Sequence, residues 1–205
     1  MNQLSTGGDA RDARAVRAAV DAAVAAFERD TKLGPLIRAL QEIAGRSDAD
    51  ALLAAAEPYR DRPEIAGPLY ECVVDLRPTD ARALVGLANA YWLHGRGGDV
   101  VGELAGRAIA ADPSNRAAWH LWALSESDPR ARVARWQQVS ERFPADDLAR
   151  ALLADNAASL AGAESDEHAL ALAILTYDDL LARAERPEQR AALETALTTL
   201  KSWTL

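Results

Sequence analysis

DLRPTD at residues 75–80, AADPSN at 110–115 and ERFPADD at 141–147 decide the fold of this 205-residue chain. In each stretch one apolar segment of helical periodicity ends, a proline follows, and another such segment begins. The prolines Pro78, Pro113 and Pro144 lie 35 and 31 residues apart. This spacing indicates an internal repeat whose unit is a pair of helices.

Apolar residues recur at helical spacing along the chain, and no segment alternates as a strand would. Pro35, Pro63, Pro129 and Pro187 stand where a first helical turn tolerates proline, and Asp128 is a suitable N-cap. The sequence therefore predicts an all-α protein, with helices near residues 9–31, 34–45, 48–60, 63–77, 81–95, 99–111, 116–126, 129–142, 146–161, 165–184 and 187–202.

The segments between the prolines resemble the tetratricopeptide repeat (TPR), whose period is about 34 residues. In the clearest unit, the residues at the positions of the TPR pattern are Leu84, Leu87, Ala88, Tyr91, Ala108 and Pro113. Ala88 is small where two helices approach closely, and Tyr70 in the preceding unit is large where a gap must be filled. The resemblance implies a right-handed α-solenoid of antiparallel helix hairpins with flanking N- and C-terminal helices.

The resemblance also suggests three segments. Residues 1–46 are predicted to form an N-terminal helical segment, either a cap or an extra half-repeat, and residues 47–184 the TPR-like repeats. Residues 185–205 are predicted to form a capping helix, because Trp203 continues the stripe of Leu193, Leu197 and Leu200. Trp119, Trp122 and Trp136 fall at pattern positions that face a core, which favours packing over ligand stacking.

The composition limits the classes of partner and the cellular location that we expect. The formal net charge of −8 repels phosphate backbones, so nucleic acid is not an expected partner. No apolar run is long enough to span a bilayer, and the first residues lack the apolar core of a secretion signal, so we expect a cytoplasmic protein. Arginine far outnumbers lysine and alanine is abundant, which is typical of a GC-rich bacterial genome. The one cysteine, Cys72, is expected to be buried and inert.

The glycine-rich stretch YWLHGRGGDVVGELAG at residues 91–106 raises the question of a nucleotide site. Gly97 and Gly102 have the spacing of a P-loop, but Glu103 and Leu104 stand where lysine and Ser/Thr are required. We therefore interpret the stretch as a turn between two helices, with Gly95 ending the first. The three histidines are far apart and no Ser/His or Cys/His arrangement is visible, so no catalytic residue, cofactor or metal is predicted.

In TPR proteins the first helix of each pair lines a concave groove that binds extended peptides or partner helices. By resemblance, the groove positions of this chain are Arg82, Val85, Asn89, Trp92, Arg96, His120, Leu124 and Asp155, with Ala151 and Ser159 beside the last. Trp92 lies off the stripe of core positions and would supply apolar area for a partner. The competing interpretation is that these side chains contact a neighbouring helix.

Three classes of function are left open. The first is a non-catalytic adaptor or scaffold that holds a protein or peptide in the groove. The second is an assembly or oligomerisation subunit that self-associates through its ends or through the apolar N-terminal helix carrying Val16, Val20, Val24 and Phe27. The third is an enzyme with its site in the N-terminal part. The subclass of TPR that grips chaperone tails is not favoured, because Val85 stands where its clamp has lysine.

Overall fold

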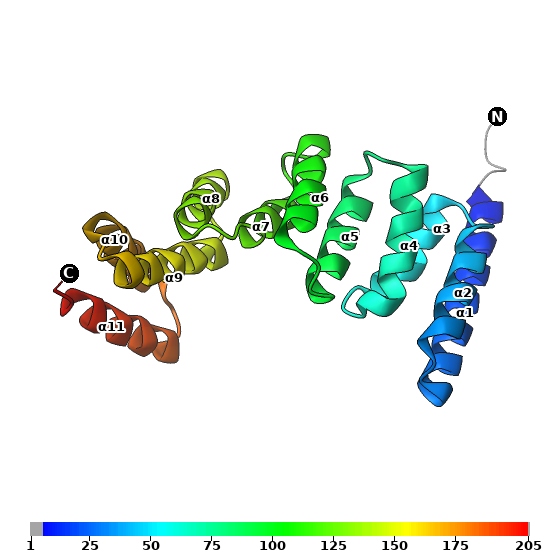
Figure 1. Ribbon diagram of the computed structural model, residues 1–205, viewed down its shortest axis with the longest axis horizontal. Helices are drawn as coiled ribbons and strands as arrows, with labels where there is room; N and C mark the ends of the chain where they lie inside the picture. The colour runs from blue at the N-terminus through cyan, green and yellow to red at the C-terminus, as the bar shows by residue number, and fades with distance from the viewer. Residues whose placement is uncertain (1–5, 205) are drawn as a thin grey trace. The chain divides into compact units, whose positions relative to one another are not determined.

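The computed structural model describes residues 6–204, and the side chains from residue 13 onward. All regular structure in these residues is helical (Figure 1). The elements are α1 (Thr6–Asp30), α2 (Leu33–Ala44), α3 (Ala49–Ala56), the 3-10 helix η1 (Glu57–Tyr59), α4 (Pro63–Leu76), α5 (Ala81–Leu93), α6 (Gly98–Ala111), α7 (Arg116–Leu124), α8 (Pro129–Arg142), α9 (Asp147–Glu164), α10 (Glu167–Arg183) and α11 (Pro187–Lys201). The predicted all-helical fold class is confirmed.

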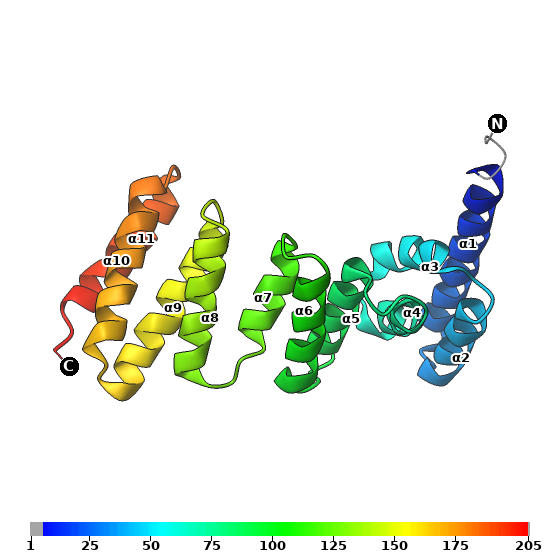
Figure 2. The ribbon, with the colours of Figure 1, turned by 90° about the horizontal axis from the view of Figure 1, so that it is seen from above.

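By its contacts the chain divides into two units, residues 1–121 and 122–205, and the boundary falls within α7. In unit 1, α1 packs on α2 and α3, α2 packs on α4, and α3 packs on α4 (Figure 2). Helix α4 also packs on α5, and α5 on α6. The first 45 residues, whose pairing the sequence leaves undefined, thus contain a helix hairpin that stacks on the next hairpin.

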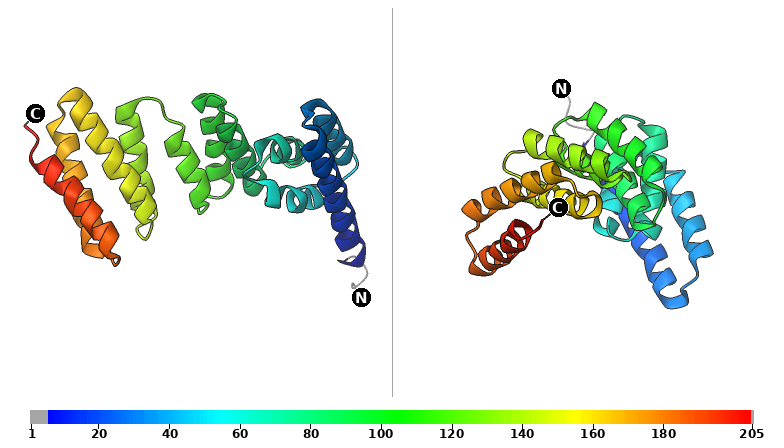
Figure 3. Two further views of the ribbon diagram at one scale, coloured as in Figure 1. Left: turned by 90° about the horizontal axis from the view of Figure 1, so that it is seen from below. Right: turned by 60° about the vertical axis from the view of Figure 1, so that its left-hand side comes forward.

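In unit 2, α9 packs on α8 and on α10, and α11 packs on α10 (Figure 3). Trp136 on α8 is fully buried, as predicted for a core residue. Trp203 is 36% exposed and lies against α9, where a Cβ added to Gly162 would come within 3.3 Å of the indole. Trp203 therefore covers the edge of unit 2 and does not enter its core.

The three stretches that mark the repeats adopt one local structure. In each, the residue before the proline accepts a hydrogen bond from the backbone N–H three residues later, which closes a β-turn with proline in its second position. These bonds run from Asp80 to Arg77 at 3.0 Å, from Asn115 to Asp112 at 3.1 Å and from Asp146 to Phe143 at 2.9 Å. The last residue of the turn then caps the next helix. Its side chain accepts from Ala83 N–H at 3.1 Å, Ala118 N–H at 3.3 Å and Ala149 N–H at 3.2 Å, respectively.

The glycine-rich stretch is a helix-ending turn, as the sequence predicts. Gly95 has φ +70°, a left-handed conformation that glycine adopts without steric cost. Its N–H donates to the carbonyl of Trp92 and the N–H of Arg96 donates to the carbonyl of Tyr91, both at 3.0 Å. These two bonds form a Schellman motif, which satisfies the last carbonyls of α5.

The contact between α4 and α5 is unusually close at Gly86. A Cβ built on Gly86 would come within 2.5 Å of Cζ in Tyr70 on α4, so the Tyr70 ring rests on the α5 backbone. Tyr70 is only 4% exposed and has little room to move aside. Ala88, on the buried side of α5, is also fully covered. Small residues on α5 thus set how closely the two helices pack.

We expect Gly86→Ala to lower the free energy of unfolding by roughly 1–3 kcal/mol, because the new methyl group overpacks against Tyr70. Gly106→Ala on α6 is the matched control, since a Cβ there meets nothing within 4 Å. That change should raise stability by roughly 0.5–1 kcal/mol through helix propensity alone. Urea denaturation of both variants checks the prediction, and equal stabilisation by the two changes would contradict it.

Candidate functional site

Four of the predicted groove residues share one face of α5. Arg82, Val85, Asn89 and Trp92 follow one another at intervals of three or four residues, so they lie on one side of the helix. We call this surface the α5 face. Arg82 and Trp92 are exposed and the other two are half-buried. The core residues of α5, by contrast, are at most 4% exposed.

Asn89 holds the α5 face against the segment that follows η1. Its side-chain N–H donates to the backbone carbonyl of Arg60 at 3.3 Å. The amide of Asn89 therefore has a structural partner as well as a place on the surface. The sequence leaves two interpretations open for this position, a surface residue for a partner and a contact with a neighbouring segment, and Asn89 has features of both.

Charged side chains lie near Tyr70, at the end of the α5 face that carries Arg82. Burial is the main cause that raises the pKa of Tyr70, and the carboxylate of Glu57 adds to the rise. The guanidinium groups of Arg82 and Arg60 oppose it, which places both cations near the Tyr70 ring. The surface near Tyr70 thus carries one carboxylate, that of Glu57, and two guanidinium groups, those of Arg60 and Arg82.

Trp92 is the largest apolar side chain that the α5 face offers to solvent. Its exposed fraction is 39%, and the adjacent Leu93 is 49% exposed. Trp92 is therefore the side chain of the α5 face with the most exposed apolar surface.

Arg96 does not join these four residues. Its guanidinium carbon lies 4.2 Å from the centre of the Tyr91 ring, whose hydroxyl donates to Glu71 on α4 at 2.7 Å. Arg96 also lines a pocket of about 240 Å³ with residues of α2 and α4, such as Leu33 and Pro68. The sequence could not reveal this placement, because it depends on the direction in which the chain leaves Gly95.

The other predicted groove residues are divided between the units. His120 is half-buried in the part of α7 that belongs to unit 1, and Leu124 is half-buried at the start of unit 2. Asp155 lies on α9, and its carboxylate accepts a hydrogen bond from the hydroxyl of Tyr177 on α10. Asp155 and Ala151 both line a pocket of about 370 Å³ between α9, α10 and α11. Helical spacing puts Ala151 and Asp155 on one face of α9, but it could not show that side chains of α10 and α11 complete a pocket around them.

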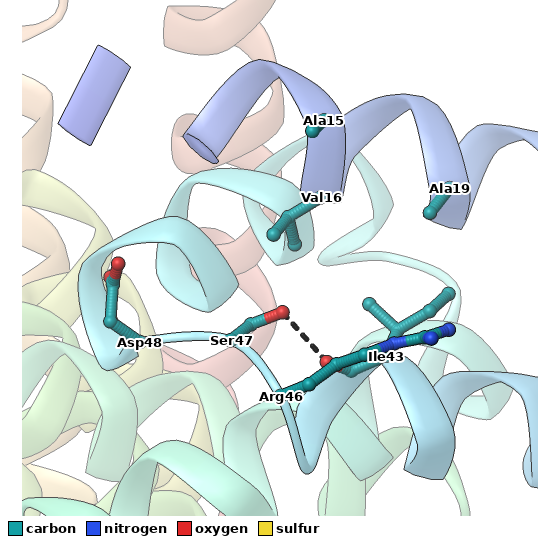
Figure 4. A pocket seen from close by; sticks show the side chains of 7 residues that line it. All are labelled: Ala15, Val16, Ala19, Ile43, Arg46, Ser47 and Asp48. Carbon is teal, nitrogen blue, oxygen red and sulfur yellow. Dashed lines mark hydrogen bonds between the residues drawn. The ribbon is translucent and has the colours of Figure 1, made fainter. Parts of the chain in front are cut away.

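The apolar N-terminal helix uses most of its apolar face internally. Val20 and Val24 are at most 4% exposed. Val16 lines a pocket of about 300 Å³, where it faces Ile43 of α2 (Figure 4). In the wall of this pocket the hydroxyl of Ser47 donates to the Ile43 carbonyl at 2.6 Å. The apolar stripe thus serves mainly to join α1 to the rest of unit 1.

Side chains that could bind a metal ion or act as nucleophiles are dispersed over the described residues. Within them, no cluster of three or more His, Cys, Asp or Glu side chains is arranged to hold a metal ion. Cys72 is half-buried, and burial together with Asp75 raises the pKa of its thiol. A raised pKa disfavours the nucleophilic thiolate. In the same part of the chain, no helix has the length and apolar character that crossing a membrane requires.

No family model matches the sequence, and no curated protein matches it. Solved structures do match the fold. The crystal structure of MamA protein aligns with a TM-score of 0.60 at 16% identity, covering 86% of this chain and 97% of that one. TTC0263, a thermophilic TPR protein of Thermus thermophilus, aligns with a TM-score of 0.57 at 14% identity, covering 89% and 99%. PilF of Pseudomonas aeruginosa aligns with a TM-score of 0.53 at 15% identity, covering 96% and 95%.

These similarities define the class of fold. The chain has the all-helical, TPR-like fold that the sequence motifs predict. At such identities the likeness concerns the fold, and the function has to be argued from the surface of this chain.

The hydrogen bond between Tyr91 and Glu71 predicts a pH dependence. Burial, followed by the bond to Glu71, raises the pKa of Tyr91 from 10.0 to about 12, although Arg96 opposes the rise. Because the pKa of Tyr91 is higher in the folded protein, folding favours the neutral phenol. The contribution of Tyr91 to the free energy of unfolding is therefore complete below pH 10 and is lost as the pH rises through about 12. Tyr91→Phe, which cannot ionise, should lose less stability than the wild type over this range. Urea denaturation at both ends of the range measures the difference.

Glu71→Gln is the control for this pH dependence. It keeps a hydrogen-bond acceptor for Tyr91 but removes the charge, so the pKa of Tyr91 should fall back toward 10.0. If the wild type and Tyr91→Phe lose stability in parallel above pH 10, the assigned interaction is wrong.

Proposed function

We propose that this protein is a non-catalytic scaffold that holds a peptide or partner protein on the α5 face. The observation that carries the proposal is the exposed Trp92, on a helix whose leucines are, apart from Leu93, buried. TPR-like folds among the solved structures support the same class of function, since stacked helix pairs present extended binding surfaces.

The chemistry of the α5 face suits a segment of mixed character. Trp92 offers a rigid apolar surface with one N–H donor, and Arg82 offers a guanidinium fork that binds carboxylates or backbone carbonyls. Tryptophan and arginine are the residue types that most often dominate binding energy at protein interfaces. Val85 between them extends the apolar area along the helix.

The alternative is assembly through the ends of the chain or through the N-terminal helix, and the structure of that helix gives it less support. Val20 and Val24 would have to leave the core of unit 1 to meet another subunit. Val16 and Phe27 are half-buried and offer only part of that stripe. We therefore place the partner on the α5 face.

Trp92→Ala should lower the melting temperature less than Ala88→Leu does, because Trp92 is 39% exposed and Ala88 is fully buried. Capture of the partner should weaken by about 2 kcal/mol or more if Trp92 acts as an interface hot spot. The measurement is affinity capture from the source organism with the wild type and the variant in parallel, quantified by mass spectrometry.

Leu76→Ala is the matched control for capture. Leu76 is 56% exposed and ends α4, at the opposite end of the α4–α5 pair from Trp92. Its removal should change neither stability nor capture. Ala88→Leu is the control for folding, since Ala88 is fully buried and overpacking there should cost roughly 1–3 kcal/mol. Should Trp92→Ala unfold the protein as Ala88→Leu does, Trp92 is a core residue; should it leave capture intact, the partner binds elsewhere.

A further inference from the structure

The pocket between α9, α10 and α11, which we call the Asp155 pocket, has apolar walls. Ala151 on α9 and Ala192 and Ala196 on α11 line it, together with Leu180 and Leu193. Because three of these side chains end at Cβ, the helices leave a hollow of about 370 Å³. This space is large enough for one long side chain of a partner.

The charged side chains among the described lining residues are both carboxylates, Asp147 and Asp155. Asp147 already pairs with Arg150, whose guanidinium lies 3.1 Å away and also binds Asp179. Asp155 accepts a hydrogen bond from the neutral phenol of Tyr177, and among the side chains described, those of residues 13–204, no cation lies at ion-pair distance from it. Asp155 is therefore a carboxylate on an apolar pocket with no cationic partner in the described chain.

Unit 2 as a whole has a net negative charge. Residues 122–205 contain fourteen Asp and Glu side chains against nine Arg and Lys. The surrounding field therefore attracts a cation toward the pocket. An arginine or lysine side chain fits both features, because its aliphatic stem packs on apolar walls while its charged end reaches a carboxylate.

We propose that the Asp155 pocket receives a basic side chain of a partner protein, with its stem against Ala151, Ala192 and Ala196 and its cationic end at Asp155. The inference rests on the proposed function, because it assigns to the partner a second point of attachment. The pocket differs from the α5 face in the partner chemistry that it selects. The α5 face contributes an arginine of this chain to the contact, whereas the pocket receives a basic side chain from the partner.

The test uses N-acetyl-L-arginine methylamide as the probe, titrated into the full-length ¹⁵N-labelled protein and followed by NMR. The amide signals of residues 147–155, 177–180 and 189–196 should shift in a saturable way. The citrulline analogue has the same shape without the charge, so it should bind about threefold to fivefold more weakly, as the loss of a partly exposed ion pair implies.

Asp155→Asn should reduce the arginine affinity to that of the citrulline analogue. Glu194→Gln is the matched control, because it removes one negative charge from an exposed position of α11 outside the pocket lining. It should leave the affinity unchanged. Ala192→Leu, at an exposed position, fills the pocket and should abolish the localised shifts. This second variant keeps the test valid if Asp155→Asn alters stability.

Shifts that are absent, scattered over the protein or equal for both probes would overturn the proposal. Equal loss of affinity in Asp155→Asn and Glu194→Gln would overturn it too, because the attraction would then be a general effect of net charge. Concentration-dependent dimerisation that Asp155→Asn abolishes would replace the partner with a second copy of this chain. None of these results bears on the proposed role of Trp92, because that role is measured separately, by affinity capture of the partner with Trp92→Ala.

Discussion

The ring of Tyr70 resting on the backbone at Gly86 determines which side of α5 is available to a partner. A side chain at position 86 would keep the two helices apart, because its Cβ would lie 2.5 Å from the ring. With glycine there, α4 packs directly on α5, and the remaining positions around the helix are fixed. Leu84, Leu87 and Ala88 face the core, and Arg82, Val85 and Trp92 are left on the outer side.

The turns between helix pairs depend on contacts that reach beyond the turn itself. In each of the three turns the proline carbonyl accepts a hydrogen bond from a side chain of a following helix. Arg107 donates to Pro78 and the indole of Trp119 donates to Pro113, both at 3.0 Å, and Arg150 donates to Pro144. Proline fixes the direction of the turn, and the side chain then holds the turn against the helices after it. Trp119, predicted as a core residue, is half-buried because its N–H has this role.

The helices could be predicted closely from the sequence because their ends are marked by residues with local effects. Pro63, Pro129 and Pro187 start helices, and Gly95 ends one, for reasons that act within one turn of chain. The surface could be predicted only in part. Helical spacing assigns Arg82, Val85, Asn89 and Trp92 to one face, but the bond from Asn89 to Arg60 and the stacking of Arg96 on Tyr91 join residues of different segments. No pattern within one helix contains that information.

Two alanine residues show why the fold can be predicted from the sequence more completely than the site. Ala88 is fully buried, whereas Ala192 is exposed on the wall of the Asp155 pocket. The two residues have the same helix propensity and both lie in amphipathic segments, and only the repeat pattern, which includes Ala88 and not Ala192, distinguishes them in the sequence. Where a neighbouring helix closes on the alanine, its small size brings two backbones together. Where no helix closes on it, the same small size leaves a hollow, and Asp155 beside that hollow is the carboxylate to which the proposed basic side chain of a partner would bind.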